Sequence, residues 1–233
     1  MTIEDLIRRS PIRIFEQSIH GGLKGGETGV IAAPNGIGKT SVLVQIALYK
    51  LLQSHKVIHV SFVRHIDHVL SWYEDIFDEF TKKKSLEHAN EVKNSLVKNR
   101  VLMNFNQEGM TCEQILKSLR SLIVEGGFQA ESLIIDGLDF SLTDAGFFRA
   151  VKQFGSELDL SVWYSCSAPE GAYDNRKIPL VIKDYVDALD VVIALEQKLS
   201  YIELSVSKDR NVYTPSSATL KLDPKTLLVL EVA

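Results

Sequence analysis

The chain has 233 residues, of which 45% are hydrophobic and 24% are charged, so one folded domain with its own core is expected. Its formal net charge of −4 gives no support for binding to a nucleic acid or another polyanion through bulk charge. Two cysteines that lie far apart, Cys112 and Cys166, and the lack of a long apolar run predict a reduced, cytoplasmic protein without a membrane-spanning segment.

The first part of the chain contains the most informative pattern. Residues 1–28 are predicted to be an N-terminal lead-in that closes with a flexible, hairpin-like stretch, Gly21–Gly26. An apolar strand is predicted over Gly29–Ala32 and a helix over Ser41–Leu52, and between them the sequence reads Ala-Pro-Asn-Gly-Ile-Gly-Lys-Thr. A strand, a glycine-rich turn that ends in Gly-Lys-Thr, and a helix, in this order, are typical of a loop that binds the phosphates of a nucleotide.

Each residue type in this loop has a chemical role. The glycines allow backbone N–H groups to point at phosphate oxygens, and the following helix adds its positive N-terminal end. Lys39 is expected to contact the β- and γ-phosphates and the hydroxyl of Thr40 to ligate Mg²⁺. Ala33 stands where the pattern has glycine, but alanine can keep a strand-like backbone, so the loop is expected to form. The residues predicted to bind nucleotide here are Pro34, Asn35, Gly36, Ile37, Gly38, Lys39, Thr40 and Ser41.

The rest of the chain alternates between strands and helices and then changes. Further strands are predicted at 57–63, 101–105, 132–136 and 161–167. Helices are predicted at 66–77, 82–98, 112–125 and 147–154, the third after a capping box that starts at Thr111. From residue 190 onward, apolar segments at 191–195, 202–206, 220–222 and 227–232 follow without helices, so they are expected to pair as antiparallel hairpins.

Such an alternation predicts an α/β fold with a mostly parallel sheet, and ligands at the carboxyl ends of its strands. The phosphate loop, Asp136 and the segment Ser165–Ser167 all follow predicted strands, so they are expected at one edge. On its own, Asp136 is explained equally well as a turn-forming acid at a strand end. Beside the phosphate loop, it is expected to hold a water on Mg²⁺.

Four segments in order make the chain resemble the RecA/RadA/KaiC branch of the P-loop ATPases, and most of all its KaiC-like members. They are Gly21-Gly22-Leu23, Asn35–Thr40, Leu133–Asp136 and Ser207–Asn211. The likeness runs from about residue 11 to the C-terminus. It implies a single RecA-like nucleotide-binding domain over residues 1–233, with a mostly parallel sheet flanked by helices and C-terminal antiparallel hairpins.

The resemblance also implies ligands and partners. ATP and Mg²⁺ are the expected ligands, and copies of the chain, or a related P-loop protein, are expected to form a ring or filament with nucleotide at the interfaces. Lys208 and Arg210 match a Lys-x-Arg of the family and would contact the γ-phosphate bound by the next subunit. An exposed basic turn is the alternative. By resemblance, Ser165 or Ser167 would sense the γ-phosphate; otherwise these residues only finish a strand.

The family's water-polarising glutamate is missing from both of its usual positions. Val63 and Arg64 stand at the end of the strand after the first helix, and Gly137 follows Asp136 directly. Nothing in the spacing selects a substitute among Asp67, Glu74 and Asp139. The sequence therefore predicts an ATP-binding regulator or scaffold with weak or absent hydrolysis.

Two other functions stay open at this point. Lys208 and Arg210 favour an active ATPase motor in DNA recombination, repair or remodelling, whereas Ala33 alone favours a degenerate domain that only binds partners. The loop over 168–183 takes the position of a DNA-contacting loop in recombinases, but its charges nearly cancel. His65 and His68 lack a third metal ligand at a suitable spacing, and the lysines at 82–84 are expected on a solvated helix face.

Overall fold

The computed structural model describes residues 2–63, 66–82, 89–213 and 216–230 of the chain. Within these residues, one nine-stranded sheet forms in the order β3-β2-β4-β5-β1-β6-β7-β8-β9. The first six strands in this order are parallel, and the last three pair antiparallel. The strands are β1 (Thr28–Ala33), β2 (Val57–Ser61), β3 (Arg100–Asn104), β4 (Ser132–Asp136), β5 (Ser161–Ser167), β6 (Val191–Gln197), β7 (Ile202–Asp209), β8 (Ser216–Leu222) and β9 (Val229–Leu230).

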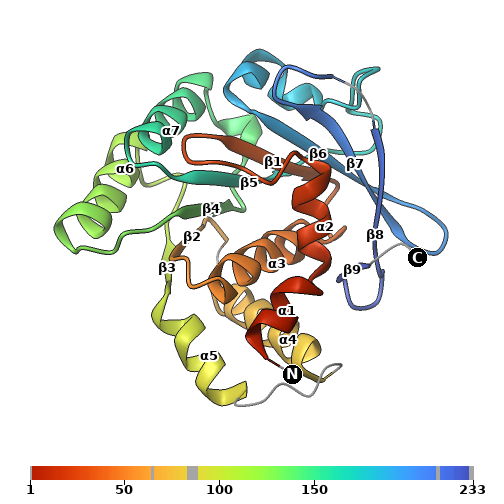
Figure 1. Cartoon of the computed structure of the whole chain (residues 1–233). Helices are drawn as coiled ribbons and strands as arrows, with labels where there is room; N and C mark the ends of the chain where they lie inside the picture. Colours follow the sequence, from red (N-terminus) through yellow and green to blue (C-terminus); the bar gives the residue numbers. More distant parts are fainter. Residues whose placement is uncertain (1, 64–65, 83–88, 214–215, 231–233) are drawn as a thin grey trace.

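Helices cover both faces of this sheet (Figure 1). One face packs against α1 (Ile3–Arg8), α2 (Pro11–Ser18), α3 (Lys39–Leu52), α4 (Asp67–Lys82) and α5 (Ala89–Lys98). The other face packs against α6 (Cys112–Arg120), its π-helical continuation η1 (Ser121–Glu125), the short 3₁₀ segments η2 (Phe140–Leu142) and η3 (Leu180–Ala188), and α7 (Ala145–Glu157). The predicted α/β class, the mostly parallel sheet and the antiparallel C-terminal strands are confirmed.

The alternation of side chains along a strand divides the core into two layers. In β1, Val30 and Ala32 pack on the α6–α7 side, whereas Ile31 and Ala33 pack on the α3 side, and all four are fully buried. Helix α3 lies under this sheet and is buried along almost its whole length. The loop between β1 and α3 is therefore held at both ends by buried elements.

Several boundaries differ from those predicted. The second strand ends at Ser61 rather than at residue 63, and α4 runs on to Lys82. The predicted lysine-rich helix over 82–98 is described only from Ala89, because residues 83–88 lie outside the described part of the chain. The last predicted strand is short, with β9 covering Val229–Leu230 and residues 231–232 lying outside the described part.

The lead-in is the largest correction to the predicted fold. The lead-in was predicted without any assigned helix, but α1 and α2 form within residues 3–18, and Gly21–Gly26 forms turns rather than a hairpin. Ser10 caps α2 through a bond from the N–H of Ile12, and Pro11 occupies its first turn. Ile12 and Phe15 are almost fully buried in the α3-side core, so these helices belong to the domain.

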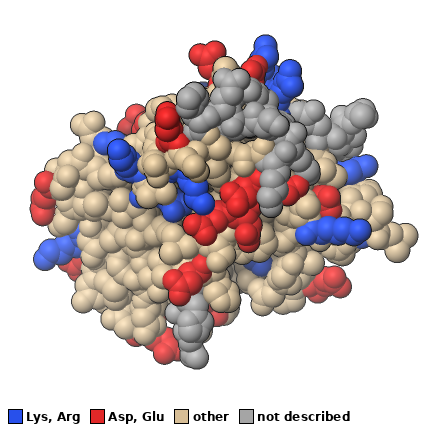
Figure 2. Space-filling view, turned by 90° about the horizontal axis from the view of Figure 1, so that it is seen from below, with Lys and Arg blue, Asp and Glu red and all other residues tan. Residues whose placement is uncertain are grey.

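The surface and the helices place limits on the ligands and partners of the molecule. In the described ranges, every helix is too short or too polar to cross a membrane. On the face shown in Figure 2, acidic and basic side chains are interspersed, and acidic groups gather near its centre. This face does not present the broad basic area that binding to a nucleic acid backbone requires.

Candidate functional site

Two glycines shape the loop between β1 and α3. Gly36 and Gly38 have left-handed backbones, with φ of 82° and 98°, and Gly38 is the residue that caps α3. A Cβ at position 36 would meet nothing within 4 Å, so the backbone angle rather than space requires glycine there. In the described part of the chain, no side chain caps the start of α3. The free N–H groups of its first turn and its positive end are therefore available to an anion.

Ala33 fits the loop as predicted. It is the last residue of β1, pairs with Ser167 of β5, and is absent from the residues with a left-handed backbone. The ammonium of Lys39 folds back over the loop and donates to the carbonyl oxygens of Ala33 at 3.1 Å and Pro34 at 3.0 Å. Burial lowers the pKa of Lys39 from its ordinary value. A partly desolvated cation thus lies against the loop.

Thr40 and Asp136 meet beside the start of α3. The Thr40 hydroxyl donates to Oδ2 of Asp136 at 2.9 Å, and the Asp136 side chain is almost fully buried. A hydroxyl and a carboxylate are the hard oxygen donors that Mg²⁺ prefers, so the pair fits this metal. Within the described residues, no group of three or more His, Cys, Asp or Glu side chains could hold a metal. Mg²⁺ would therefore need phosphate and water oxygens as its other ligands.

Strand β5 lies between β4 and β1 and brings two serines to the site. The hydroxyl of Ser165 accepts a bond from the backbone N–H of Gly137 at 2.9 Å, which fixes the chain just after Asp136. The hydroxyl of Ser167 donates to Oδ1 of Asn35 in the loop at 2.7 Å. Both serines therefore have hydrogen-bond partners beside the loop, and a role in sensing the γ-phosphate stays a prediction.

These groups surround a cavity of about 290 Å³, called the cradle below. Its lining consists of Asn35, Gly36, Gly38, Lys39, Thr40, Ser41, Val63, Trp72, Asp136, Gly137, Ser165, Ser167 and Leu227. Most of the predicted nucleotide-binding residues thus come together around one space. Pro34 and Ile37 do not line it.

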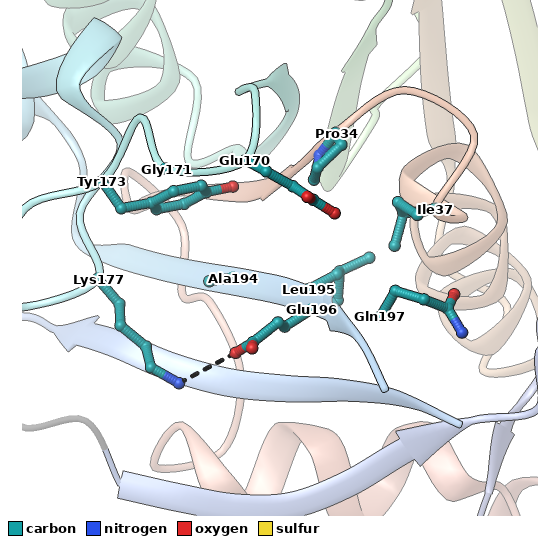
Figure 3. Close-up of a pocket in the computed structure, with 10 residues that line it drawn as sticks. All are labelled: Pro34, Ile37, Glu170, Gly171, Tyr173, Lys177, Ala194, Leu195, Glu196 and Gln197. Carbon is teal, nitrogen blue, oxygen red and sulfur yellow. Dashed lines mark hydrogen bonds and ion pairs between the residues drawn. The ribbon is translucent and has the colours of Figure 1, made fainter. Parts of the chain in front are cut away.

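Pro34 and Ile37 line a second cavity of about 460 Å³ on the other side of the loop, shown in Figure 3. Its remaining walls come from the end of β6 and from the segment after β5. There, Lys177 pairs with Glu196 at 3.5 Å, and the hydrogen bond from Lys198 lowers the pKa of Glu196. Glu196, one of the two acidic residues that line this cavity, is thus already paired with cations of the same chain.

Two residues of the cradle were not predicted. Trp72 belongs to the amphipathic helix α4, and its sequence position carries no motif. Leu227 lies in the turn between β8 and β9, and its carbonyl accepts bonds from Ser41 and Gln45, both at 2.9 Å. The side-chain oxygen of Gln45 in turn accepts the N–H of Val229. This turn is therefore tied to the first turns of α3.

Among the residues that the structure describes, one carboxylate lines the cradle, that of Asp136. Asp139 lines a separate hollow of about 840 Å³ and accepts bonds from Ser141. Asp67 and Glu74 do not line the cradle. Arg64 and His65 lie outside the described residues, and His68 lines a small cavity beside Trp72.

Lys208 and Arg210 lie at the opposite end of the strands from the loop between β1 and α3. Lys208 pairs with Val192 near the start of β6, and β6 starts beside the first residues of β1. The Lys208 ammonium is buried and donates to the carbonyl oxygens of Val186, at 2.9 Å, and Leu189. The alternative of an exposed basic turn is therefore wrong for Lys208.

Arg210 is also engaged within its own chain. Its guanidinium donates to both carboxylate oxygens of Glu27, at 2.7 and 3.1 Å, and to Asp209 at 2.5 Å. Two further bonds reach the carbonyl oxygens of Ile19 and Gly22, each at 2.8 Å. Contact with a neighbouring subunit stays a prediction for both cations, and these bonds count against it.

The loop over 168–183 gives no support for a nucleic acid ligand. Arg176 stacks on the ring of Tyr213, with its guanidinium carbon 5.0 Å from the ring centre, and Lys177 pairs with Glu196. The segment ends at Leu180, where η3 begins. Two of its cations are thus already used within the chain.

A buried histidine lies behind the cradle. His59 of β2 is fully buried, its Nδ1 lies 3.0 Å from the hydroxyl of Tyr73, and its Nε2 lies 3.9 Å from Oδ2 of Asp136. Burial lowers the pKa of His59 to about 4, so the ring is neutral near pH 7. In the sequence, this residue looked like any other position of an apolar strand.

This pKa predicts an acid-sensitive fold. The unfolded chain binds a proton at His59 near pH 6.5, whereas the folded chain does so only near pH 4. The free energy of unfolding is thus unaffected above pH 6.5 and falls by about 2 kcal/mol as the pH drops from 6.5 to about 5. Urea unfolding at several pH values, without nucleotide or Mg²⁺, should show this loss, and His59→Gln should lack it. A variant as acid-sensitive as the wild type would contradict the assignment.

The chain matches no protein-family model and no curated protein sequence. A functional conclusion therefore depends on the geometry of the site.

Proposed function

We propose that the chain is an ATP-binding protein with a RecA/KaiC-like core, and that it binds Mg-ATP in the cradle. The observation that carries this proposal is the combination of an uncapped α3, whose first residue is Lys39, with the bond between Thr40 and Asp136. The free N–H groups and the ammonium suit phosphate oxygens, and the oxygen pair suits Mg²⁺. Bound Mg²⁺ would neutralise part of the phosphate charge.

We propose further that hydrolysis is weak or absent. A general base must reach the attacking water by a hydrogen bond, and among the described residues Asp136 is the only carboxylate that lines the cradle. Asp136 already accepts a hydrogen bond from Thr40 and, in the proposal, also binds the metal. A protein that binds ATP without rapid turnover acts as a regulator or scaffold. The resemblance to KaiC-like proteins supports assembly of several copies with nucleotide between them.

Trp72 provides a direct test of the proposal. The chain has two tryptophans, and Trp72 lines the cradle whereas Trp163 is buried in β5. Titration with Mg-ATP should change the tryptophan emission of the wild type in a saturable way. In Trp72→Phe the change should vanish, because Trp163 is packed against Phe15 away from the cradle. A wild type whose emission is unaltered by millimolar Mg-ATP would contradict the proposed site.

An active ATPase is the second candidate. The hollow of about 840 Å³ shares Val63 and Gly137 with the cradle and brings Glu108 and Asp139 close to it. Bound nucleotide could draw one of these carboxylates towards the water. Steady phosphate release that is lost in Asp139→Asn would identify a working ATPase and contradict weak hydrolysis. We expect no release above a slow background in either protein.

A further inference from the structure

His59 belongs to a row of polar and aromatic side chains that leads to Asp136. The guanidinium carbon of Arg100 lies 4.0 Å from the centre of the Tyr73 ring, and the Tyr73 hydroxyl lies 3.0 Å from Nδ1 of His59. Strand β2 lies between β3 and β4, so Arg100, His59 and Asp136 come from three neighbouring strands. Tyr73 reaches them from α4, which covers this face of the sheet. This row of side chains thus runs from β3, at the edge of the sheet, to Asp136 in the cradle.

The second ring nitrogen of His59 has no hydrogen-bond partner within the described residues, although it is completely buried. An unsatisfied buried polar atom is costly and needs an explanation. The nitrogen faces Oδ2 of Asp136 at 3.9 Å, beyond hydrogen-bond distance. The same oxygen accepts the Thr40 hydroxyl at 2.9 Å. A small movement of the carboxylate would bring the two groups into contact.

The position of the single ring proton determines whether Nε2 of His59 can donate a hydrogen bond to Asp136. A neutral imidazole has one N–H, and the hydrogen bond at one nitrogen selects the position of that proton. The Tyr73 hydroxyl can donate to Nδ1, and the Arg100 guanidinium lies over the Tyr73 ring. With Nδ1 accepting, the N–H is on Nε2 and is directed at the carboxylate of Asp136.

We infer that His59 is a positioning residue, whose Nε2–H donates to Asp136 and holds its carboxylate in the orientation that Mg²⁺ requires. The inference rests on the proposed function, because it concerns the metal that accompanies ATP. Groups that hydrogen-bond to a metal ligand commonly change metal affinity by about 10- to 100-fold. His59 acts on Asp136 and not on the nucleotide. Its loss should therefore weaken the effect of Mg²⁺ while leaving metal-free ATP binding unchanged.

The test measures ATP binding by calorimetry, in EDTA and over a range of Mg²⁺ concentrations. In His59→Leu, the half-saturating Mg²⁺ concentration should rise by about 10- to 100-fold, with unchanged ATP affinity in EDTA. His59→Gln places an amide N–H near the position of Nε2 and should recover part of the loss. His55→Leu is the matched control, because this partly exposed histidine lies just before β2 and faces Glu131 just before β4. It should behave as the wild type.

Each outcome supports or contradicts the inference. A His59→Leu protein with wild-type Mg²⁺ dependence overturns it, and so does a His59→Gln protein as defective as His59→Leu, since packing would then explain both. If His59→Leu does not fold, Tyr73→Phe takes its place, because it removes the hydroxyl that orients the ring. Wild-type ATP binding that ignores Mg²⁺ overturns this inference and the Mg²⁺ site of the proposed function, but leaves ATP binding in place. A wild type that binds no ATP in either condition overturns the proposed function itself.

Discussion

Lys39→Ala is expected to lose about half or more of the stabilisation that Mg-ATP gives to the wild type at the same ligand concentration. Ligand at about 100 times its dissociation constant adds about 2.7 kcal/mol to the free energy of unfolding. For a domain of this size, that is a rise in Tm of roughly 5–11 °C. Lys39 supplies the ammonium that lies over the loop, and a hydrogen bond to a charged group contributes about 1.5–3 kcal/mol. The affinity of the variant should therefore fall by roughly 10- to 150-fold.

The control for Lys39→Ala is a variant that loses a lysine outside the cradle. Lys98, an exposed residue at the end of α5, does not line the cradle, so Lys98→Ala should keep the full shift in Tm. Differential scanning calorimetry with and without Mg-ATP measures all three proteins. An equal shift in Lys39→Ala and in the wild type would place the nucleotide outside the cradle. No shift in the wild type would contradict ATP binding altogether.

The loop was predictable because its determinants are local. Gly36 and Gly38 are needed for left-handed backbone angles within a few residues, and strand and helix patterns adjoin them directly. Asp136 was placed correctly for a topological reason, since parallel strands bring their carboxyl ends to one edge. The same reasoning placed Ser165. It did not resolve which side of the loop each side chain faces, so it did not anticipate that Pro34 and Ile37 line a second cavity; nucleotide binding by these two residues stays a prediction.

The parts that sequence reasoning missed depend on contacts between distant segments. Leu227 reaches Ser41 across 186 positions, and no spacing rule connects a turn between C-terminal strands with the first core helix. Trp72 and His59 follow the periodic patterns of an ordinary helix and strand, which report burial but not what a side chain faces. For the lead-in, the signals were present in Ser10 and Pro11, a helix start that the glycines after it obscured.

Arg210 illustrates how a family pattern and a structure lead to different expectations for one residue. Arg210→Ala is expected to lower the free energy of unfolding by about 2–4 kcal/mol, because it removes the guanidinium from the carboxylates of Glu27 and Asp209, of which Asp209 keeps, within the described residues, only its contact with His20. The value lies below that of a fully buried pair, since the Arg210 side chain is 25% exposed. The carbonyl oxygens of Ile19 and Gly22 lose their donors as well. A decrease in Tm of roughly 4–16 °C should follow.

The Glu27→Gln variant separates the two roles of Arg210. If the arginine joins the turns after α2 to the end of β7, Glu27→Gln removes one of its ion-pair partners. This variant should then also lower Tm, by less than Arg210→Ala does. If Arg210 instead contacts the nucleotide of a neighbouring subunit, Glu27→Gln should leave nucleotide-dependent assembly intact, and Arg210→Ala should keep its Tm but lose that assembly. Calorimetry and mass measurement with and without Mg-ATP distinguish these outcomes. The N–H groups of Arg210 that bond to its own chain cannot donate to a phosphate at the same time. We therefore expect Arg210→Ala to lower Tm.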